Sequence, residues 1–235
     1  MLEKSGLIDR LLTDSVYDSY YNEGKNTIVN LFGEELAATI DFDQKNPHHC
    51  YDLFGHLLKS VDNIKASIDI NNYDDKILLV AAIFHDVGKV DVAVCKDGKN
   101  VFYGHANKSA IKVGPVLKRM GFDESEIKII QFYINHHDDF ISWRFADENV
   151  NSWNQYLRPI TVEEVEKYFA KNMKDYNNES WIKDKLTWVR LIKLCYADVQ
   201  AQAETAIWQG KVVGTMEEKM GKLKAIESLI NKVMA

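Results

Sequence analysis

The chain has 235 residues, of which 46% are apolar and only 3 are proline, as is typical of a helical globular protein with one large domain. Its 29 basic and 35 acidic residues give a net charge of −6, which argues against a broad nucleic-acid-binding surface but leaves room for a local basic patch. The three cysteines form no CxxC pair, the N-terminus lacks a signal-peptide pattern, and no apolar run approaches ~18 residues. We therefore expect a cytoplasmic protein with reduced thiols and no membrane-spanning segment.

The periodicity of the apolar residues predicts an all-α fold with about eight helices. In chain order, the expected helices are two short ones within residues 1–40, then 51–68, 76–87, 105–120, 124–137, one that begins at 161, 181–208 and 216–234. The segments predicted to be loops, turns or irregular structure are 41–47, 71–75, 91–104 and 143–158.

Proline at position 115 should kink or divide the helix that contains it, because proline removes a backbone hydrogen-bond donor. No internal repeat or convincing linker interrupts the chain. We expect a helical segment at residues 1–40 that packs on a central domain at 41–205, followed by a helical extension at 206–235.

The most informative stretch is a run of apolar residues at 77–84 that leads directly into His85 and Asp86, with Lys89 close behind. The Leu-Leu and Ala-Ala pairs within the run favour a helix that Gly88 ends. Such a run belongs in a core, and a buried carboxylate without a partner destabilises a fold by several kcal/mol. Asp86 therefore needs a nearby cation, which is either a lysine or arginine or a metal ion.

Two more polar side chains occur on apolar helix faces. Asp198 shares its predicted face with Leu191 and Leu194, so a second carboxylate points into the packed interior. His56 lies beside a leucine stripe, and Asp52, one turn earlier, is placed to hold its second ring nitrogen, as metal-bound histidines usually require.

The core-facing segments thus offer four nitrogen and oxygen ligands: His56, His85, Asp86 and Asp198. Imidazole with carboxylate suits Mn, Fe, Co, Ni, Zn or Mg, and the lack of a thiolate pattern argues against structural zinc. Other histidines are expected either to complete a second metal shell or to contact a substrate phosphate: His105, His136 and His137.

Each of these residues also has a structural interpretation. A single core histidine is more often satisfied by hydrogen bonds than by a metal. The carboxylates could form buried ion pairs instead, Asp86 with Lys89 and Asp198 with Arg190 or Lys193. Two such pairs in one core stabilise poorly, because desolvation offsets their attraction, so we favour a shared metal. Two histidines that follow Pro47 in a loop are expected at the surface, His48 and His49.

The order His56, His85-Asp86 and Asp198 resembles the H…HD…D signature of the HD superfamily of metal-dependent phosphohydrolases. Three further segments are similar to the HD domain of bacterial CCA-adding tRNA nucleotidyltransferases: 44–56, 103–110 and 196–202. The resemblance covers roughly residues 31–202. No residues remain for the nucleotidyltransferase head, so nucleotide addition is not expected.

This resemblance implies a single-domain helical HD fold and a divalent ion of unknown identity held by His56, His85, Asp86 and Asp198. It implies a second metal site or substrate contacts at His105 and at His137 or His136. The residues with expected catalytic roles are Asp86, Lys89, His105 and His137. The residues with expected substrate contacts are Lys89, His105, Lys108, His136 and His137.

The reaction that the resemblance implies is hydrolysis of a phosphomonoester or a (cyclic) phosphodiester, in a nucleotide, another phosphorylated small molecule or an RNA 3′ end. The HD domains of some CCA-adding enzymes show phosphatase and 2′,3′-cyclic phosphodiesterase activity. The alternative is a tRNA- or nucleotide-binding HD module without turnover. The amphipathic C-terminal tail is expected to pack on the body or on a second copy in a homodimer, rather than on a membrane.

Overall fold

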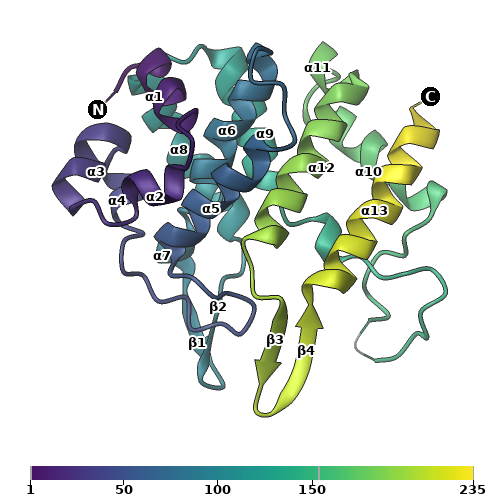
Figure 1. Cartoon of the computed structure of the whole chain (residues 1–235). Coiled ribbons are helices and arrows are strands. Elements are labelled where there is room, and N and C mark those ends of the chain that lie inside the picture. Colours follow the sequence, from purple (N-terminus) through teal and green to yellow (C-terminus); the bar gives the residue numbers. More distant parts are fainter. Residues whose placement is uncertain (1, 153, 235) are drawn as a thin grey trace.

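Helices dominate the structure, a computed structural model that describes residues 2–152 and 154–234 (Figure 1). The first helices are α1 (Lys4–Leu11), α2 (Val16–Tyr20), α3 (Lys25–Phe32), α4 (Glu34–Ala37), α5 (Leu53–Lys65), α6 (Tyr73–Phe84), α7 (Lys89–Val92) and α8 (His105–Arg119). The later ones are α9 (Glu124–His136), the 3-10 turn η1 (Phe140–Ser142), α10 (Val162–Asp175), α11 (Ser180–Lys183), α12 (Lys185–Gln200) and α13 (Met216–Val233). The prediction of a helical fold is confirmed.

Helix α6 lies at the centre of the helical body, where it packs against α1, α5, α9 and α12 (Figure 1). Its residues from Ile77 to Phe84 are all buried, as expected of a helix that is apolar on every side. The helix ends at Phe84. The next two residues, His85 and Asp86, lie directly after this buried run and are themselves almost completely inaccessible to solvent. The apolar run therefore places polar groups inside the core.

An ion pair fixes the start of α6 to α12. The Arg190 guanidinium donates from Nε to Asp75 Oδ1 over 2.7 Å, and its Nη1 lies 3.4 Å from Asp74 Oδ2. Lys193 Nζ lies 3.9 Å from the other oxygen of Asp75. Both basic residues thus pair at the start of α6, and the alternative in which one of them neutralises Asp198 is not observed.

Replacing Asp75 by asparagine should destabilise the fold by about 2 kcal/mol at neutral pH, because the substitution leaves the buried Arg190 charge with only the exposed Asp74 carboxylate as its partner. Burial alone would raise the pKa of Asp75, but the hydrogen bonds from Arg190 and the Asp69 backbone, together with the charges of Arg190 and Lys193, outweigh burial and hold this pKa below its ordinary value. The carboxylate's contribution is therefore complete above the unfolded-state pKa of about 3.9 and is lost as the pH falls through the lower folded-state pKa. Urea unfolding at several pH values should show the wild-type advantage over Asp75→Asn shrinking only below about pH 4. An advantage that stays constant down to pH 2 would contradict this account.

The N-terminal segment contains four short helices, where the sequence suggested two. Ser15 caps α2 by accepting from the backbone N–H of Asp18, and Gly33 separates α3 from α4 with a φ of 99°, which favours glycine.

Pro115 does not divide α8. Ile111 and Pro115 both lie on the exposed side of that helix, so water can satisfy the carbonyl that loses its donor.

Two hairpins replace segments that were predicted as loop or helix. Strands β1 (Val94–Lys96) and β2 (Lys99–Val101) lie within the expected loop 91–104, and Asp97-Gly98 forms their two-residue turn. Strands β3 (Thr205–Trp208) and β4 (Lys211–Thr215) follow α12, which ends at Gln200 rather than near Trp208. Both residues of each turn have positive φ, the conformation that joins tightly paired strands. The extension at 206–235 is therefore part hairpin and part helix, which corrects the prediction that it is helical.

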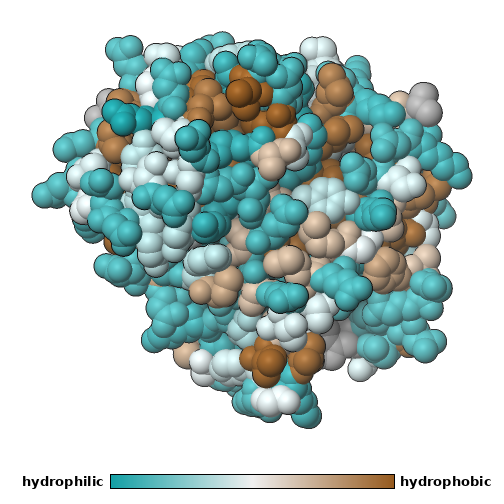
Figure 2. Space-filling view, in the orientation of Figure 1, coloured by the Kyte–Doolittle hydropathy of each residue, from teal (hydrophilic) through white to brown (hydrophobic). Residues whose placement is uncertain are grey.

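The surface in Figure 2 is mostly hydrophilic, with an apolar patch over the β3–β4 hairpin at the bottom of the view. Ile207 and Val212 of this hairpin are 59% and 62% exposed. Within the described ranges, no helix combines the length and the apolar character needed to cross a bilayer.

Candidate metal centre

Three helices bring two imidazoles and two carboxylates together in the core. His56 lies on α5, His85 and Asp86 follow α6, and Asp198 lies near the end of α12. His56 Nε2 is 3.2 Å from His85 Nε2 and 3.0 Å from Asp198 Oδ1, and Asp86 Oδ2 is 3.4 Å from both Nε2 atoms. One potential ligand atom from each residue lies within 4.8 Å of all the others, and all four residues are buried. The structure thus brings together the four residues that the sequence singled out.

The orientation of each imidazole is fixed by a backbone carbonyl. His56 Nδ1 lies 3.1 Å from the carbonyl oxygen of Ala201, and His85 Nδ1 lies 2.7 Å from that of Ala82. A carbonyl only accepts, so Nδ1 carries the proton and donates, and the Nε2 atoms turn toward each other. Two facing Nε2 lone pairs repel unless a cation lies between them. Asp52, expected to orient His56, instead caps α5 by accepting from a backbone N–H.

A second group shares Asp86 with the first. Asp86 Oδ1 is 3.1 Å from His105 Nε2 and 3.4 Å from His137 Nε2. These imidazoles are again tied through Nδ1 to backbone carbonyls, those of Phe102 at 2.9 Å and Ile134 at 2.7 Å. Oδ2 of Asp86 therefore faces the first group and Oδ1 the second, as in a carboxylate that can bridge two ions.

Lys89 forms the ion pair with Asp86 that was considered as the alternative to a metal ion, with its Nζ 2.6 Å from Asp86 Oδ2. The ammonium also donates to Gln44 Oε1 over 3.0 Å and lies 3.2 Å from His49 Nε2. A single lysine neutralises one of the two buried carboxylates. Within the part of the chain that the structure describes, Asp86 Oδ1 accepts no hydrogen bond. A buried carboxylate oxygen without a hydrogen bond, surrounded by imidazole Nε2 atoms, fits a bound divalent ion.

The charges within the cluster support this fit. Burial alone would raise the pKa of Asp198, but His56 and His85 outweigh burial and hold this pKa well below its ordinary value. Burial alone would lower the pKa of His85, but Asp86 and Asp198 outweigh burial and raise it to about 9. The carboxylates therefore stay ionised and favour a positive charge among the imidazoles, which is either a proton or a divalent ion that replaces it. Cys195, one turn before Asp198, is kept a neutral thiol because burial raises its pKa.

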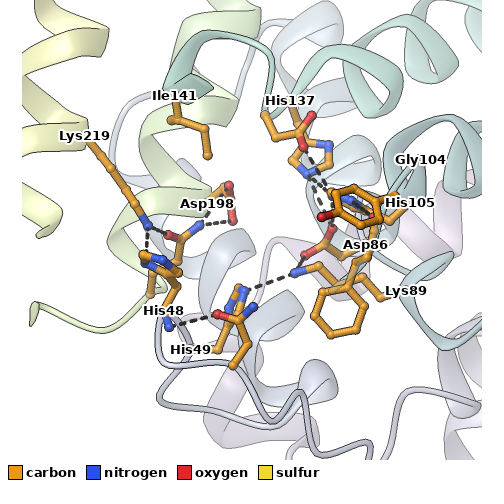
Figure 3. A pocket seen from close by; sticks show the side chains of 15 residues that line it. His48, His49, Asp86, Lys89, Gly104, His105, His137, Ile141, Asp198 and Lys219 are labelled. Atoms are coloured by element: carbon orange, nitrogen blue, oxygen red, sulfur yellow. Dashed lines mark hydrogen bonds and ion pairs between the residues drawn. The ribbon is translucent and has the colours of Figure 1, made fainter. Parts of the chain in front are cut away.

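The cluster opens onto a cavity of about 360 Å³ (Figure 3). Lys89, His105 and His137 lie on one side of this cavity, and Lys219 reaches in from the other. The residues of its wall that the sequence analysis did not assign to the site are Asn46, His48, His49, Phe102, Tyr103, Gly104, Asp138, Ile141, Gln202 and Lys219. The prediction that His48 and His49 are surface residues is corrected, because their loop folds over the cluster.

The loop 44–50 is held over the cluster by the chain that follows α12. Ala203 donates its backbone N–H to the carbonyl oxygen of His48 over 2.9 Å. A Cβ at Gly214 would lie 2.9 Å from the His48 ring, so β4 can approach this closely only through glycine. Such contacts between residues far apart in sequence leave no local pattern, which explains why the cavity wall was incompletely predicted.

Glycine at position 88 sets the distance between the HD pair and α8. A Cβ there would lie 2.6 Å from the backbone nitrogen of Ser109, whose hydroxyl accepts from the Gly88 N–H over 2.9 Å. Ser109 and His105 share the inward face of α8.

Lys108 is exposed and lines neither this cavity nor the neighbouring one, so the structure does not bring this predicted substrate contact to the site.

The adjacent histidines 136 and 137 face different surroundings. His137 joins the cluster, whereas His136 lies beside a neighbouring cavity in a hydrogen-bond network with Asp139 and two tyrosines. His136 Nδ1 is 2.7 Å from Asp139 Oδ2, which also accepts from Tyr168 over 2.6 Å, and His136 Nε2 is 3.1 Å from the Tyr176 hydroxyl. His136 is therefore satisfied by protein groups and does not face the metal centre.

Separate substitutions of these two histidines should have different effects: one should lower activity and the other should lower stability. His137→Gln should lower hydrolysis by about 100-fold or more, because it removes an imidazole from the cluster. His136→Gln should keep activity within about threefold but lower the melting temperature, since it disrupts a buried network worth about 2 kcal/mol. Steady-state kinetics and thermal unfolding of both variants measure the two effects. Equal activity losses would contradict the assignment.

The sequence profile of the HD domain family matches residues 49–182, more than half of the chain. The matched segment contains His56, His85, Asp86, His105 and His137, but ends before Asp198. No curated protein matches the chain. The profile supports the family but not the closer resemblance to CCA-adding enzymes. Members of this family are generally metal-dependent phosphohydrolases that bind divalent ions. The chain belongs to the HD domain family.

Proposed function

We propose that the protein is a metal-dependent phosphohydrolase that cleaves a phosphomonoester or a (cyclic) phosphodiester of a nucleotide or an RNA end. The observation that carries this proposal is the convergence of His56, His85, Asp86 and Asp198, with the Nε2 atoms turned inward, at the floor of an open cavity. A buried structural site would have no need of the cavity. A catalytic site requires one, because water and substrate must reach the ion.

These four residues would hold a divalent ion, which when bound would supply a water nucleophile at neutral pH and offset the charge that develops on the phosphoryl group. Lys89 is placed to bind a phosphate oxygen. Its ammonium lines the cavity, and it is held by Gln44, His49 and the ring of Phe102, whose centroid is 5.2 Å away. Several fixed neighbours limit the movement of Nζ, so little reorganisation accompanies substrate binding.

His105 is the residue best placed to give a proton to the leaving oxygen. Its side chain is 14% exposed, compared with 2% for His137, and its Nε2 lies 3.5 Å from Asp138 Oδ2. Asp138 also lines the cavity, and it belongs to a second His-Asp doublet in the sequence. In a two-ion site, His105 and His137 would hold the second ion with Asp86.

The cavity wall supports a nucleotide as substrate. Phe102 and Tyr103 line it, and Tyr103 is 77% exposed at the rim, where an aromatic ring can stack on a base.

The cysteines support a reducing compartment such as the cytoplasm, where nucleotides are abundant, because Cys50, Cys95 and Cys195 are all free thiols.

A phosphoester screen with the metal-stripped protein tests the proposal. Adding Mn, Co, Ni or Mg should restore release of phosphate from nucleoside monophosphates, or opening of 2′,3′-cyclic nucleotides. A non-catalytic tRNA- or nucleotide-binding module would instead bind these ligands, or tRNA in a salt-dependent gel shift, without turnover under any metal. Binding without turnover would overturn the proposed reaction in favour of that module.

A further inference from the structure

Lys219 brings a positive charge to the cavity from outside the segment that the family profile covers. It lies in the first turn of α13, beyond residue 182, where the HD match ends. Its Nζ donates to Gln202 Oε1 over 2.5 Å and lies 3.3 Å from His48 Nδ1. Gln202 in turn donates to both oxygens of Asp198, over 3.1 and 3.2 Å. Figure 3 shows Lys219 on the side of the cavity opposite Lys89.

No described carboxylate lies within ion-pair distance of the Lys219 ammonium, although the side chain is only partly exposed. Lys89 is paired with Asp86, and Lys222, one turn further along α13, is paired with Glu218 over 2.8 Å. Burial lowers the pKa of Lys219, as expected for a cation without a counter-ion. A partly buried cation of this kind lowers stability unless an anion joins it.

The position of Lys219 within α13 adds to the destabilising effect of its unpaired charge. The N-terminus of a helix carries a partial positive charge, so a cation in the first turn is disfavoured. The other charged residues of that turn, Glu217 and Glu218, follow the usual preference, and Thr215 caps the helix. Lys219 departs from this preference at the one place in α13 that reaches the cavity.

The charge balance of the cavity indicates which anion fits. A divalent ion balances Asp86 and Asp198, and Asp138 at the rim is 33% exposed and lies beside His105. With the Asp138 carboxylate paired to a protonated His105 over 3.5 Å, Lys89 and Lys219 then remain as two positive charges that face the same cavity. Two cations match the dianion of a phosphomonoester, whereas a phosphodiester carries one negative charge.

We propose that Lys219, together with Lys89, binds the phosphate dianion and makes this chain hydrolyse phosphomonoesters in preference to phosphodiesters. The inference rests on the proposed function and narrows it to one substrate class. It also assigns a specificity role to the C-terminal helix α13, which lies outside the segment that the family profile matches.

Lys219 could instead serve only to orient the amide of Gln202, and through it Asp198. Loss of Lys219 would then weaken metal binding and reduce the hydrolysis of every substrate equally. A direct role toward phosphate predicts unchanged metal affinity and a loss confined to dianionic substrates. These opposite expectations allow one set of variants to separate the two roles.

The kinetic test compares Lys219→Met with Lys219→Arg, which keeps the charge, and with Lys224→Met, which removes an exposed lysine from the same helix. The substrates are p-nitrophenyl phosphate and bis(p-nitrophenyl) phosphate, which share a leaving group. We expect Lys219→Met to lower kcat/KM for the monoester by about 10- to 100-fold and to change the diester by less than about threefold. Lys219→Arg should retain most monoester activity, and Lys224→Met all of it. Equal losses on both substrates, or no loss, would overturn the inference.

A binding test does not depend on turnover. Calorimetric titration of the metal-loaded protein with sulfate, a dianion, and with dimethyl phosphate, a monoanion, should show that Lys219→Met weakens sulfate binding about tenfold and leaves dimethyl phosphate unchanged. Sulfate binding that is insensitive to Lys219→Met would defeat this inference even in an active phosphohydrolase. Absence of hydrolysis of any phosphoester, with Lys219-dependent sulfate binding intact, would defeat only the proposed reaction.

Discussion

Asp86→Asn should abolish metal-dependent hydrolysis, with a loss well above the roughly 10- to 100-fold typical of changes to residues that merely orient a metal ligand. The carboxylate faces four Nε2 atoms and the Lys89 ammonium, so its negative charge is shared by both ligand groups. Asparagine preserves the shape but removes the charge that holds a divalent ion and balances Lys89. Activity assays across a range of metal concentrations, with bound metal measured in parallel, test this expectation.

Asp91→Asn is the matched control. Asp91 lies on the short helix α7, which begins three residues after Asp86; it pairs with Lys112 over 3.0 Å and lines neither cavity of the site. It should retain activity within about twofold, since exposed ion pairs contribute less than about 1 kcal/mol. Wild-type activity in a folded Asp86→Asn variant would refute a role for this residue in catalysis.

Asp198→Asn should lower metal affinity by about 100-fold or more and reduce hydrolysis in proportion. Asp198 is the candidate ligand that the family profile does not reach, so its proposed role rests on the sequence pattern and the geometry of the cluster. Its Oδ1 lies 3.0 Å from His56 Nε2 and 3.6 Å from His85 Nε2. Because Gln202 can still hydrogen-bond to an amide oxygen at this position, the fold should be retained, and circular dichroism verifies this.

Glu204→Gln removes a negative charge from an exposed position shortly after Asp198 and serves as the control for charge alone. Calorimetric titration of the metal-stripped proteins should show wild-type affinity in Glu204→Gln and weak binding in Asp198→Asn. Equal affinities in the wild type and Asp198→Asn would exclude Asp198 as a ligand.

The helical fold and the four clustered residues could be predicted because their signals are local. Apolar periodicity identified α5, α6 and α12, and the polar residues within or directly after these apolar faces became buried, as expected for His56, Asp86 and Asp198. A carboxylate within an apolar pattern is informative because its burial needs a compensating cation.

The rest of the cavity wall could not be predicted, because it depends on contacts between distant segments. His48 reaches the cavity because β4 and Ala203 hold its loop in place, and Lys219 reaches it because the β3–β4 hairpin returns the chain to α12. Local signals for both hairpins existed in Asp97-Gly98 and Gln209-Gly210, turns that favour paired strands. They were missed because the strands are short and adjoin helical patterns.

The histidine doublet at 136 and 137 shows a different limit. Adjacent residues on a helix differ by about 100° in direction, and only the packing of α9 determines which one faces the cluster. Asp139, Tyr168 and Tyr176 hold His136 on the other side. No pattern within the doublet itself distinguishes the two.

Anomalous diffraction from crystals grown with Mn tests the central claim most directly. The account predicts an ion within about 2.0–2.3 Å of the Nε2 atoms of His56 and His85 and of carboxylate oxygens of Asp86 and Asp198. A peak elsewhere, or none at this position with Asp86 paired to Lys89 alone, would contradict it.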